Sequence, residues 1–347
     1  MTMAADDDAA YKTLAALPRR LITFLRSVPL TEDADVALAA GRITVCGKRT
    51  CDGDALVVGD DVVCLDGERL QLTRGTAGAC VFAYHKPRNM CCDRTTPAPR
   101  GLGGVEDGFG YEGQRALHPV GQLDKDTSGL LLFCDHGDLT RLLLAPGCTP
   151  KRYHVGFDAA AGSTGLSAEQ LDALRDPTPR ALAPREGRKH AGAPTDYAAF
   201  DSCEPLAQPA LRAEAATPAG CTAKARFEVA VTIRSGQNHV VKRVFMERAK
   251  VAVRTLHRQG VGGLDLGALG IADRPGAWCK CTSEQVARLW DGAGGTARLL
   301  ELKRAELTAR LRDAPEDRAE LLARLSERRD AGVPPWLWEA VGAPLEE

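Results

Sequence analysis

The sequence lacks any apolar run near the roughly 20 residues that a bilayer-spanning helix needs. Its first twelve residues, MTMAADDDAAYK, contain three adjacent acids and no apolar core, unlike a secretion signal or an Arg-rich transit peptide. We therefore expect an intracellular protein, cytoplasmic rather than organellar, that makes no membrane contact.

The twelve cysteines lack the paired spacing of metal sites and redox motifs. No two cysteines stand three positions apart, and the closest are the neighbours Cys91 and Cys92 and the pair Cys279 and Cys281. Without a secretion signal, we expect mostly reduced thiols. We predict no metal site.

The chain also lacks a strong net charge, which is −1 over 347 residues. Charge is nevertheless unevenly distributed: seven Lys or Arg and one acid lie between Arg234 and Arg258. A second basic stretch runs from Arg19 to Arg49, interrupted by three acids. Local basic stretches in a neutral chain indicate a surface that binds a polyanion, although solvated helix faces explain the first stretch equally well.

Apolar spacing and turn residues predict a multidomain α+β protein. Residues 1–18 are expected to be a disordered leader, 19–70 a small module of two helices and short strands, and 293–347 a helical extension with two amphipathic helices. Residues 78–292 form the largest domain, and 203–224 are Ala- and Pro-rich, which indicates an irregular insertion. The strands alternate apolar and polar residues, which favours a mixed, mostly antiparallel sheet.

The segment HPVGQLDKDTSGLLLF, His118 to Phe133, places two acids directly before an apolar run. An acid on a loop before a buried strand is held rigidly and remains open to a cleft. Asp and Ser also form ordinary turns, so this motif alone is a weak signal. Residue chemistry does not choose between Asp124 and Asp126 as the reactive acid.

Two other segments strengthen the functional interpretation. PKRYHV contains Tyr153 in an alternating strand, and GQNHVVKRVFM places Lys242 and Arg243 at the start of a helix. An acid, a phenol and a basic helix on separate segments suit the binding of an RNA nucleotide.

The order of these blocks resembles the small-ribosomal-subunit type of pseudouridine synthase. That family has the motif GRLD-x-x-T-x-GLLL, a helix ending in Pro, K-x-Y-x-V, and a late block with Q-V-K-R-M-F and V-x-x-L-x-R. Here the corresponding stretches are GQLDKDTSGLLLF, GDLTRLLLAP, KRYHV and HVVKRVFMERAKVAVRTLHR. Residues 19–70 resemble the small RNA-binding domain named after ribosomal protein S-four, which precedes the catalytic domain in that family.

The resemblance implies roles for individual residues. Asp124 matches the catalytic aspartate, Tyr153 the tyrosine that packs on the target base, and Lys242 the basic partner of the aspartate. Val241 matches the apolar residue that flanks the base. The remaining substrate-binding residues that we expect are Gln122, Thr127, Arg243, Arg20, Arg42 and Lys48.

The chain departs from the family pattern in three places. Gln122 stands where the family has Arg, His239-Val240 departs from the late motif, and the acidic TEDAD replaces a Ser-Arg-Arg start in the small module. Gln122 forms hydrogen bonds but brings no charge, and the acids should weaken RNA binding.

We therefore predict an RNA pseudouridine synthase that acts on a specific uridine in structured RNA, with rRNA the first candidate. Isomerisation needs no redox step and releases no group, so no cofactor is expected. We expect a monomer whose partner is RNA. One alternative is an inactive RNA-binding protein that keeps this fold. Another is a small-molecule hydrolase that uses Asp124 and Asp126 as an acid pair.

Overall fold

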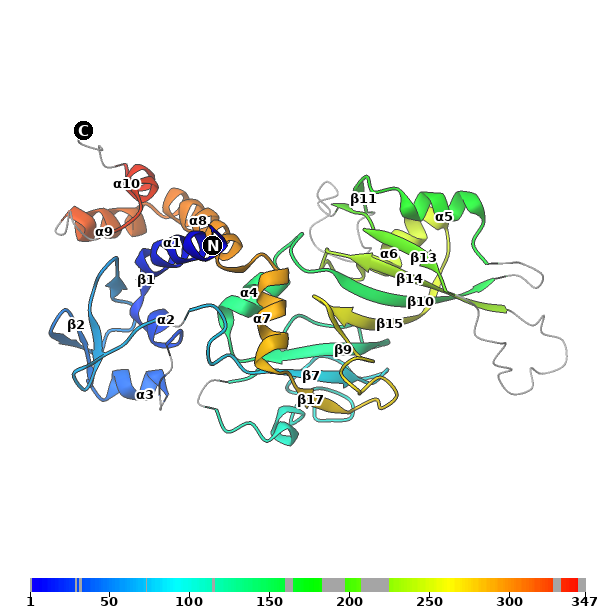
Figure 1. The fold of residues 1–347 in the computed structure, drawn as a ribbon, viewed down its shortest axis with the longest axis horizontal. Helices are drawn as coiled ribbons and strands as arrows, with labels where there is room; N and C mark the ends of the chain where they lie inside the picture. The colour runs from blue at the N-terminus through cyan, green and yellow to red at the C-terminus, as the bar shows by residue number, and fades with distance from the viewer. Residues whose placement is uncertain are drawn as a thin grey trace.

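The computed structural model describes residues 2–28, 30, 33–72, 74–113, 116–159, 165–182, 197–206, 225–326 and 332–342. The described part contains a small module at the left of Figure 1, a large sheet at its centre and right, and C-terminal helices beside the small module. No helix within these ranges is long and apolar enough to cross a membrane. The mixed, mostly antiparallel α+β fold that the sequence predicts is confirmed.

The N-terminal leader is helical, so the prediction of disorder over 1–18 was wrong. Helix α1 (Thr2–Ala16) packs on α8 (Gly295–Asp313). Leu14 and Leu17 are buried in the same apolar cluster as Leu299 of α8. The helix gains its stability from this packing against a segment almost 300 residues away, which local sequence does not reveal.

The small module has the two helices and short strands expected for 19–70. Its core consists of apolar side chains from both helices and from the strands, including Leu21, Leu25, Ala37 and Ile43. The elements are β1 (Arg19–Arg20), α2 (Leu21–Leu25), α3 (Ala34–Ala39), β2 (Ile43–Val45), β3 (Lys48–Thr50), β4 (Leu56–Val57), β5 (Val63–Leu65) and β6 (Glu68–Arg69).

The large sheet runs in the order β13-β14-β10-β15-β9-β7-β17, with β16 paired to β15 and β8 to β9. Apolar clusters cover both of its faces, so central strands such as β9 are buried on each side. The strands are β7 (Val81–Lys86), β8 (His118–Pro119), β9 (Thr127–Cys134), β10 (Lys151–Ala159), β13 (Ser202–Pro205), β14 (Ala225–Ile233), β15 (Val253–Val261), β16 (Leu264–Asp265) and β17 (Trp278–Lys280).

Strand β9 meets β15 in the one parallel pairing among the described strands of this sheet. Gly129 of β9 lies opposite Arg258 of β15 and has φ +116°. A Cβ atom at Gly129 would lie 2.2 Å from the carbonyl oxygen of Arg258. Glycine is therefore required for β15 to approach the start of β9.

Helices cover the sheet where periodicity predicts them. The segment GDLTRLLLAP forms α4, and HVVKRVFMERA begins as α6 and continues as one π-helical turn, η2. The remaining connecting elements include a 3₁₀ turn, η1, and a two-stranded ladder of β11 and β12. Their bounds are η1 (Glu106–Phe109), α4 (Gly137–Leu144), α5 (Ala168–Arg175), β11 (Arg180–Ala181), β12 (Tyr197–Ala198), α6 (Val240–Val244), η2 (Phe245–Ala249) and α7 (Ser283–Gly292).

Part of the predicted irregular insertion 203–224 is regular structure. Cys203 to Pro205 belong to β13, the edge strand that pairs with β14. Residues 207–224 lie outside the described residues. The predicted start of the insertion, residue 203, was therefore too early. Residues 203–205 form a strand because they pair with β14, which follows the insertion in the sequence.

The C-terminal extension packs on the small module as well as on the sheet domain. Two helices were predicted, and three are found in the described part: α8, α9 (Pro315–Ser326) and α10 (Pro335–Val341). Their apolar side chains share one cluster with the small module: Leu56, Val58, Leu311, Leu321, Leu325, Leu337 and Val341.

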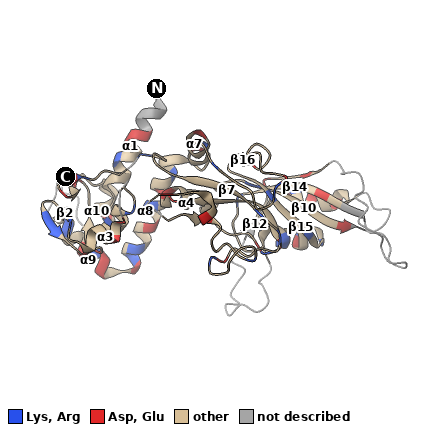
Figure 2. Ribbon diagram, turned by 90° about the horizontal axis from the view of Figure 1, so that it is seen from below, with Lys and Arg blue, Asp and Glu red and all other residues tan. Residues whose placement is uncertain are grey.

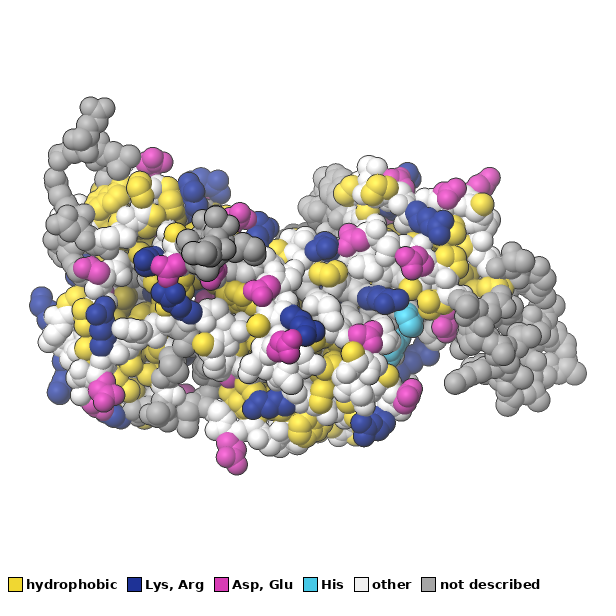
Figure 3. Space-filling model, viewed as in Figure 1, with side chains coloured by type: hydrophobic (Ala, Val, Ile, Leu, Met, Phe, Trp, Pro, Cys, Tyr) yellow, Lys and Arg dark blue, Asp and Glu magenta, His cyan; other side chains and the backbone are white. Residues whose placement is uncertain are grey.

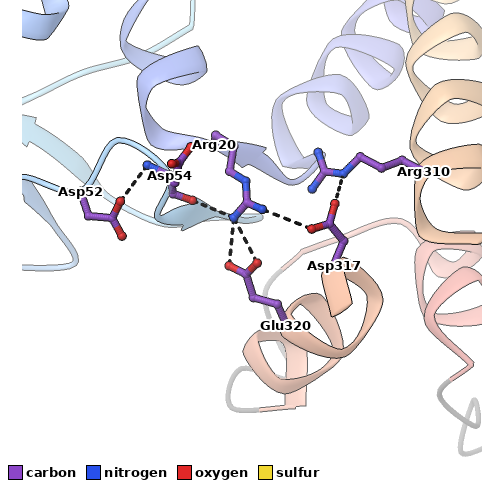
Figure 4. A network of polar contacts seen from close by, with 6 residues as sticks. All are labelled: Arg20, Asp52, Asp54, Arg310, Asp317 and Glu320. Atoms are coloured by element: carbon purple, nitrogen blue, oxygen red, sulfur yellow. Dashed lines mark hydrogen bonds and ion pairs between the residues drawn. The ribbon is translucent and has the colours of Figure 1, made fainter. Parts of the chain in front are cut away.

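A polar network lies beside this cluster (Figure 4). The guanidinium of Arg20 donates to the carbonyl of Asp54 at 2.8 Å and to Glu320 at 3.1 Å, and it lies 3.4 Å from Asp317. Arg310 donates to Asp317 at 2.5 Å. The small module and α9 are therefore joined by both apolar and ionic contacts.

Candidate active site

The loop before β9 presents Asp124 at the rim of the sheet. Leu123 is buried, and its backbone N–H points at the sulfur of Cys92, 3.3 Å away. The N–H of Thr127 donates to the carbonyl of Asp124 at 3.0 Å, which closes the turn into β9. Because both sides of Asp124 are anchored, its side chain is held in one direction.

Asp124 accepts contacts from two residues around the start of α6. With its proton on Nε2, His239 donates to Oδ1 of Asp124 across 3.0 Å. Lys242 Nζ donates to Oδ2 of Asp124 at 3.1 Å and to Asp126 at 2.7 Å. Each oxygen of Asp124 therefore has its own donor, and the ammonium of Lys242 compensates the carboxylate charge.

The two acids that sequence reasoning left open differ in surroundings. The Asp124 side chain is 20% exposed and lines a pocket, whereas the Asp126 side chain is 53% exposed and does not. Partial burial acts to raise the pKa of Asp126, but the hydrogen bond and charge of Lys242 outweigh it and lower that pKa. Asp124 is thus the acid that can meet a bound molecule.

The pocket beside Asp124 has a volume of about 90 Å³. Tyr153 of β10 and Val241 of α6 both line it and are 7% and 2% exposed. Gln122 and Thr127 line it from the loop and the first residue of β9. An aromatic ring and an aliphatic side chain beside a carboxylate can sandwich a planar base and bring its sugar to the acid.

Residues 81–247 match the family model described as RNA pseudouridylate synthase. This segment of the chain is similar to a pseudouridine synthase domain. The matched residues contain the Asp124 loop, β10 and α6, which line the pocket, whereas β15, which supplies Leu256 and Arg258 to the same pocket, lies beyond the match.

Curated relatives each resemble about a third of this chain. The ribosomal large subunit pseudouridine synthase B of Haemophilus influenzae is 37% identical over 117 residues, which are 33% of this chain and 32% of the relative. The dual-specificity RNA pseudouridine synthase RluF of Salmonella typhi is 32% identical over 127 residues, 36% of this chain and 42% of the relative. The chain thus spans about a third of the length of the curated relatives it matches.

A solved structure titled "Crystal structure of pseudouridylate synthase" is 23% identical to this chain. It covers 78% of this chain and 99% of its own length, with a TM-score of 0.39.

Several predicted substrate-binding residues lie away from the synthase pocket. Arg20 contacts α9, Arg42 pairs with Asp66, and Lys48 is exposed on β3 of the small module. Arg243 follows Lys242 on α6, is partly buried, and does not line the pocket. The structure therefore gathers Asp124, Tyr153, Lys242, Gln122, Thr127 and Val241, and leaves the other four elsewhere.

Sequence reasoning missed three residues at the synthase pocket. In the sequence His239 stands out only as a departure from a motif, yet it contacts Asp124. Lys151 and Arg258 also line the pocket, and both are buried. Arg258 occupies the last position of V-x-x-L-x-R, and Lys151 opens K-x-Y-x-V, so the motifs contained them without indicating a role.

Proposed function

We propose that this protein is an RNA pseudouridine synthase that isomerises a specific uridine in structured ribosomal RNA. The observation that carries the proposal is the carboxylate of Asp124, held by Lys242 and His239 at a pocket between Tyr153 and Val241. The family match of the surrounding segment and the names of its relatives, which act on ribosomal RNA, support it.

The residue types suit the chemistry. Pseudouridine forms when the bond from the uracil nitrogen to the ribose breaks, the base turns, and a ring carbon bonds to the same ribose carbon. That ring carbon then loses its proton, and the freed nitrogen gains one. All atoms are retained and no electrons are lost, so a carboxylate suffices as nucleophile or base at the sugar. Tyr153 and Val241 would hold the flipped base while Asp124 acts, and Gln122 would form hydrogen bonds near the nucleotide.

The small module would supply affinity rather than chemistry. Its two short helices followed by short strands support the S-four-like RNA-binding module that the resemblance implies. Exposed Lys48 and Arg49 on β3 would contact RNA phosphates, and Figure 2 shows Lys and Arg on the strands around β2. Arg20 and Arg42 already have acidic partners, so we assign them to packing of the module. We propose that the protein acts as a monomer.

A second candidate function is that of an RNA-binding protein without turnover. Gln122 and the acidic TEDAD segment support this candidate. The structure gives two of those acids local roles. Asp33 caps α3 by accepting from the N–H groups of Asp35 and Val36, and Asp35 pairs with Arg26. These acids therefore help to form the module, which weakens the argument for lost function.

The test is Asp124→Asn, which keeps the size of the side chain and removes its charge. Turnover on ribosomal RNA from a strain without this protein should fall by about 10³-fold or more in a single-turnover assay. RNA affinity should stay close to that of the wild type, because phosphate contacts dominate binding.

Asp126→Asn is the matched control, two residues along the same loop. It should retain turnover to within about tenfold, since the Asp126 side chain is 53% exposed and does not line the pocket. Comparable loss in both variants would remove Asp124 from its assigned role. A wild type that forms no pseudouridine on any ribosomal RNA would favour the RNA-binding protein instead.

A further inference from the structure

Two buried cations line the pocket on β10 and β15. Lys151 is 6% exposed and Arg258 is 4% exposed, and their strands are adjacent in the sheet. Burial, followed by the charge of Arg258, lowers the pKa of Lys151 to about 8. The guanidinium of Arg258 therefore lies close enough to disfavour charge on Lys151.

Neither cation has a carboxylate partner within the described ranges. Lys151 Nζ donates to the carbonyl of Thr149 at 3.3 Å, and Arg258 Nε donates to the carbonyl of Leu130 at 2.7 Å. Lysine has three donors and arginine five, so most of their donors have no protein acceptor in this part of the structure. Burying an unpaired charge is costly, and buried charges are normally paired.

A third group at the same pocket has a free hydrogen-bonding atom. Thr127 is 1% exposed and lines the pocket, and its hydroxyl has no partner among the described residues. A buried hydroxyl without a partner normally has an unseen one. A hydroxyl and two cations share a preference for an anionic oxygen.

We infer that Lys151, Arg258 and Thr127 form a binding site for a backbone phosphate of the nucleotide whose base enters the pocket. This inference rests on the proposed function, since it assigns a second part of the same nucleotide. A uracil carbonyl carries only a partial charge and would leave two cations uncompensated. A phosphate carries a full negative charge and matches them.

The site would also explain how the nucleotide is oriented. Asp124 lies with Lys242 and His239 at one part of the pocket lining, and Lys151 and Arg258 come from the sheet. A phosphate held on the sheet side, together with a base between Tyr153 and Val241, fixes the ribose that joins them. Positioning of this kind lowers the barrier without taking part in bond changes, so Lys151 and Arg258 are positioning residues.

The test compares binding of uridine with binding of uridine 3′,5′-bisphosphate by calorimetry, in a buffer free of phosphate and at constant ionic strength. Wild type should prefer the bisphosphate by about tenfold or more. Lys151→Met and Arg258→Met should lose most of that preference while binding uridine as wild type does. Arg258→Lys should keep part of it, because the charge remains.

Two matched controls remove a cation from the same strands outside the pocket. Arg152→Met changes the exposed neighbour of Lys151, and Arg254→Met changes an arginine of β15 that pairs with Asp158. Both should keep the preference for the bisphosphate. Equal loss in site and control variants would reduce the effect to overall charge and overturn the inference.

Wild type alone can also overturn the inference, whatever the folding of the variants. Equal affinity for uridine and its bisphosphate would show that no phosphate site exists. Weaker uridine binding in Lys151→Met would assign that lysine to the base or ribose instead. Turnover on ribosomal RNA is measured separately. An active wild type without preference for the bisphosphate would contradict the phosphate site alone. An inactive wild type that still prefers the bisphosphate would contradict the proposed function alone.

Discussion

At the scale of single residues, side chains of the same type have different surroundings at this site. Asp124 and Asp126 share Lys242, but Asp124 lines the pocket, whereas Asp126 does not and is more exposed. The lysines differ as well, because Lys242 has two carboxylate partners and Lys151 has none among the described residues. Chemical type alone therefore does not assign a role at this site.

Lys151 leads to a prediction about stability and pH. Its pKa of about 8 in the folded protein lies below the ordinary value of 10.5. Between these values the unfolded chain binds more protons, so folding becomes more favourable as pH rises through that window. The free energy of unfolding of wild type, minus that of Lys151→Met, should increase by about 2–3 kcal/mol from pH 7 to pH 10.

Urea unfolding at several pH values measures this difference, and other titrating groups largely cancel between the two proteins. A constant difference from pH 7 to pH 10 would contradict the buried, unpaired state of Lys151. Lys250→Met, at an exposed lysine outside the pocket, is the control that should show no such trend.

At the scale of elements, the parallel contact between β9 and β15 sets the position of the site. The first residues of β9 follow the Asp124 loop directly, and β15 carries Arg258. Gly129 permits this contact, since any Cβ atom there would overlap the backbone of Arg258. The positions of Asp124 and of Arg258 thus both depend on the close approach of β9 and β15.

Replacing Gly129 with alanine should therefore affect both stability and turnover. The clash with backbone and the positive φ should cost about 2–4 kcal/mol of unfolding free energy. Gly137→Ala is the control, because a Cβ atom there meets nothing within 4 Å at the start of α4. Thermal or urea unfolding of both variants measures the difference in stability. Equal stability of the two variants would contradict the requirement for glycine at position 129.

At the scale of the whole molecule, the tail joins the small module to the synthase domain. Helix α8 contacts α1, α4 and α7, and α9 and α10 share an apolar cluster with the module. On the face in Figure 3, Lys and Arg are interspersed with Asp and Glu and form no single basic patch. We therefore expect the proposed RNA binding to depend on a few exposed cations placed by this assembly.

The module's cations can be separated by experiment. Lys48→Gln combined with Arg49→Gln should lower the slope of log affinity against log salt for ribosomal RNA by about one to two units. Arg20→Gln should leave the slope unchanged, because Arg20 is held by Asp317 and Glu320. Filter binding across a salt series measures this. A lower slope in Arg20→Gln than in the double variant would instead indicate that Arg20 contacts RNA.

Local patterns in the sequence predicted the elements that local physics controls. Alternation indicated β10 and β14, and a helical period ending at Pro146 indicated α4. The resemblance then placed Asp124, Tyr153 and Lys242 together, and the structure shows Lys242 on Asp124 and Tyr153 in the same pocket.

The remainder depended on contacts between distant segments. Helix α1 is stabilised by α8, and Arg20 is held by acids about 300 positions later. His239, with φ +52° before α6, reaches Asp124 only because the β9 loop and α6 meet in space. No spacing in the chain encodes such meetings, so neither periodicity nor motif could predict them.

The shared cluster of the small module and the tail has a consequence for the order of synthesis. Leu56 emerges from the ribosome 255 residues before Leu311, its partner in that cluster. At about 5–20 residues per second, this apolar face of the nascent module stays uncovered for about 13 to 50 seconds. During that time we expect the module to bind chaperones, and helices α8 to α10 then complete a domain that is synthesised long before them.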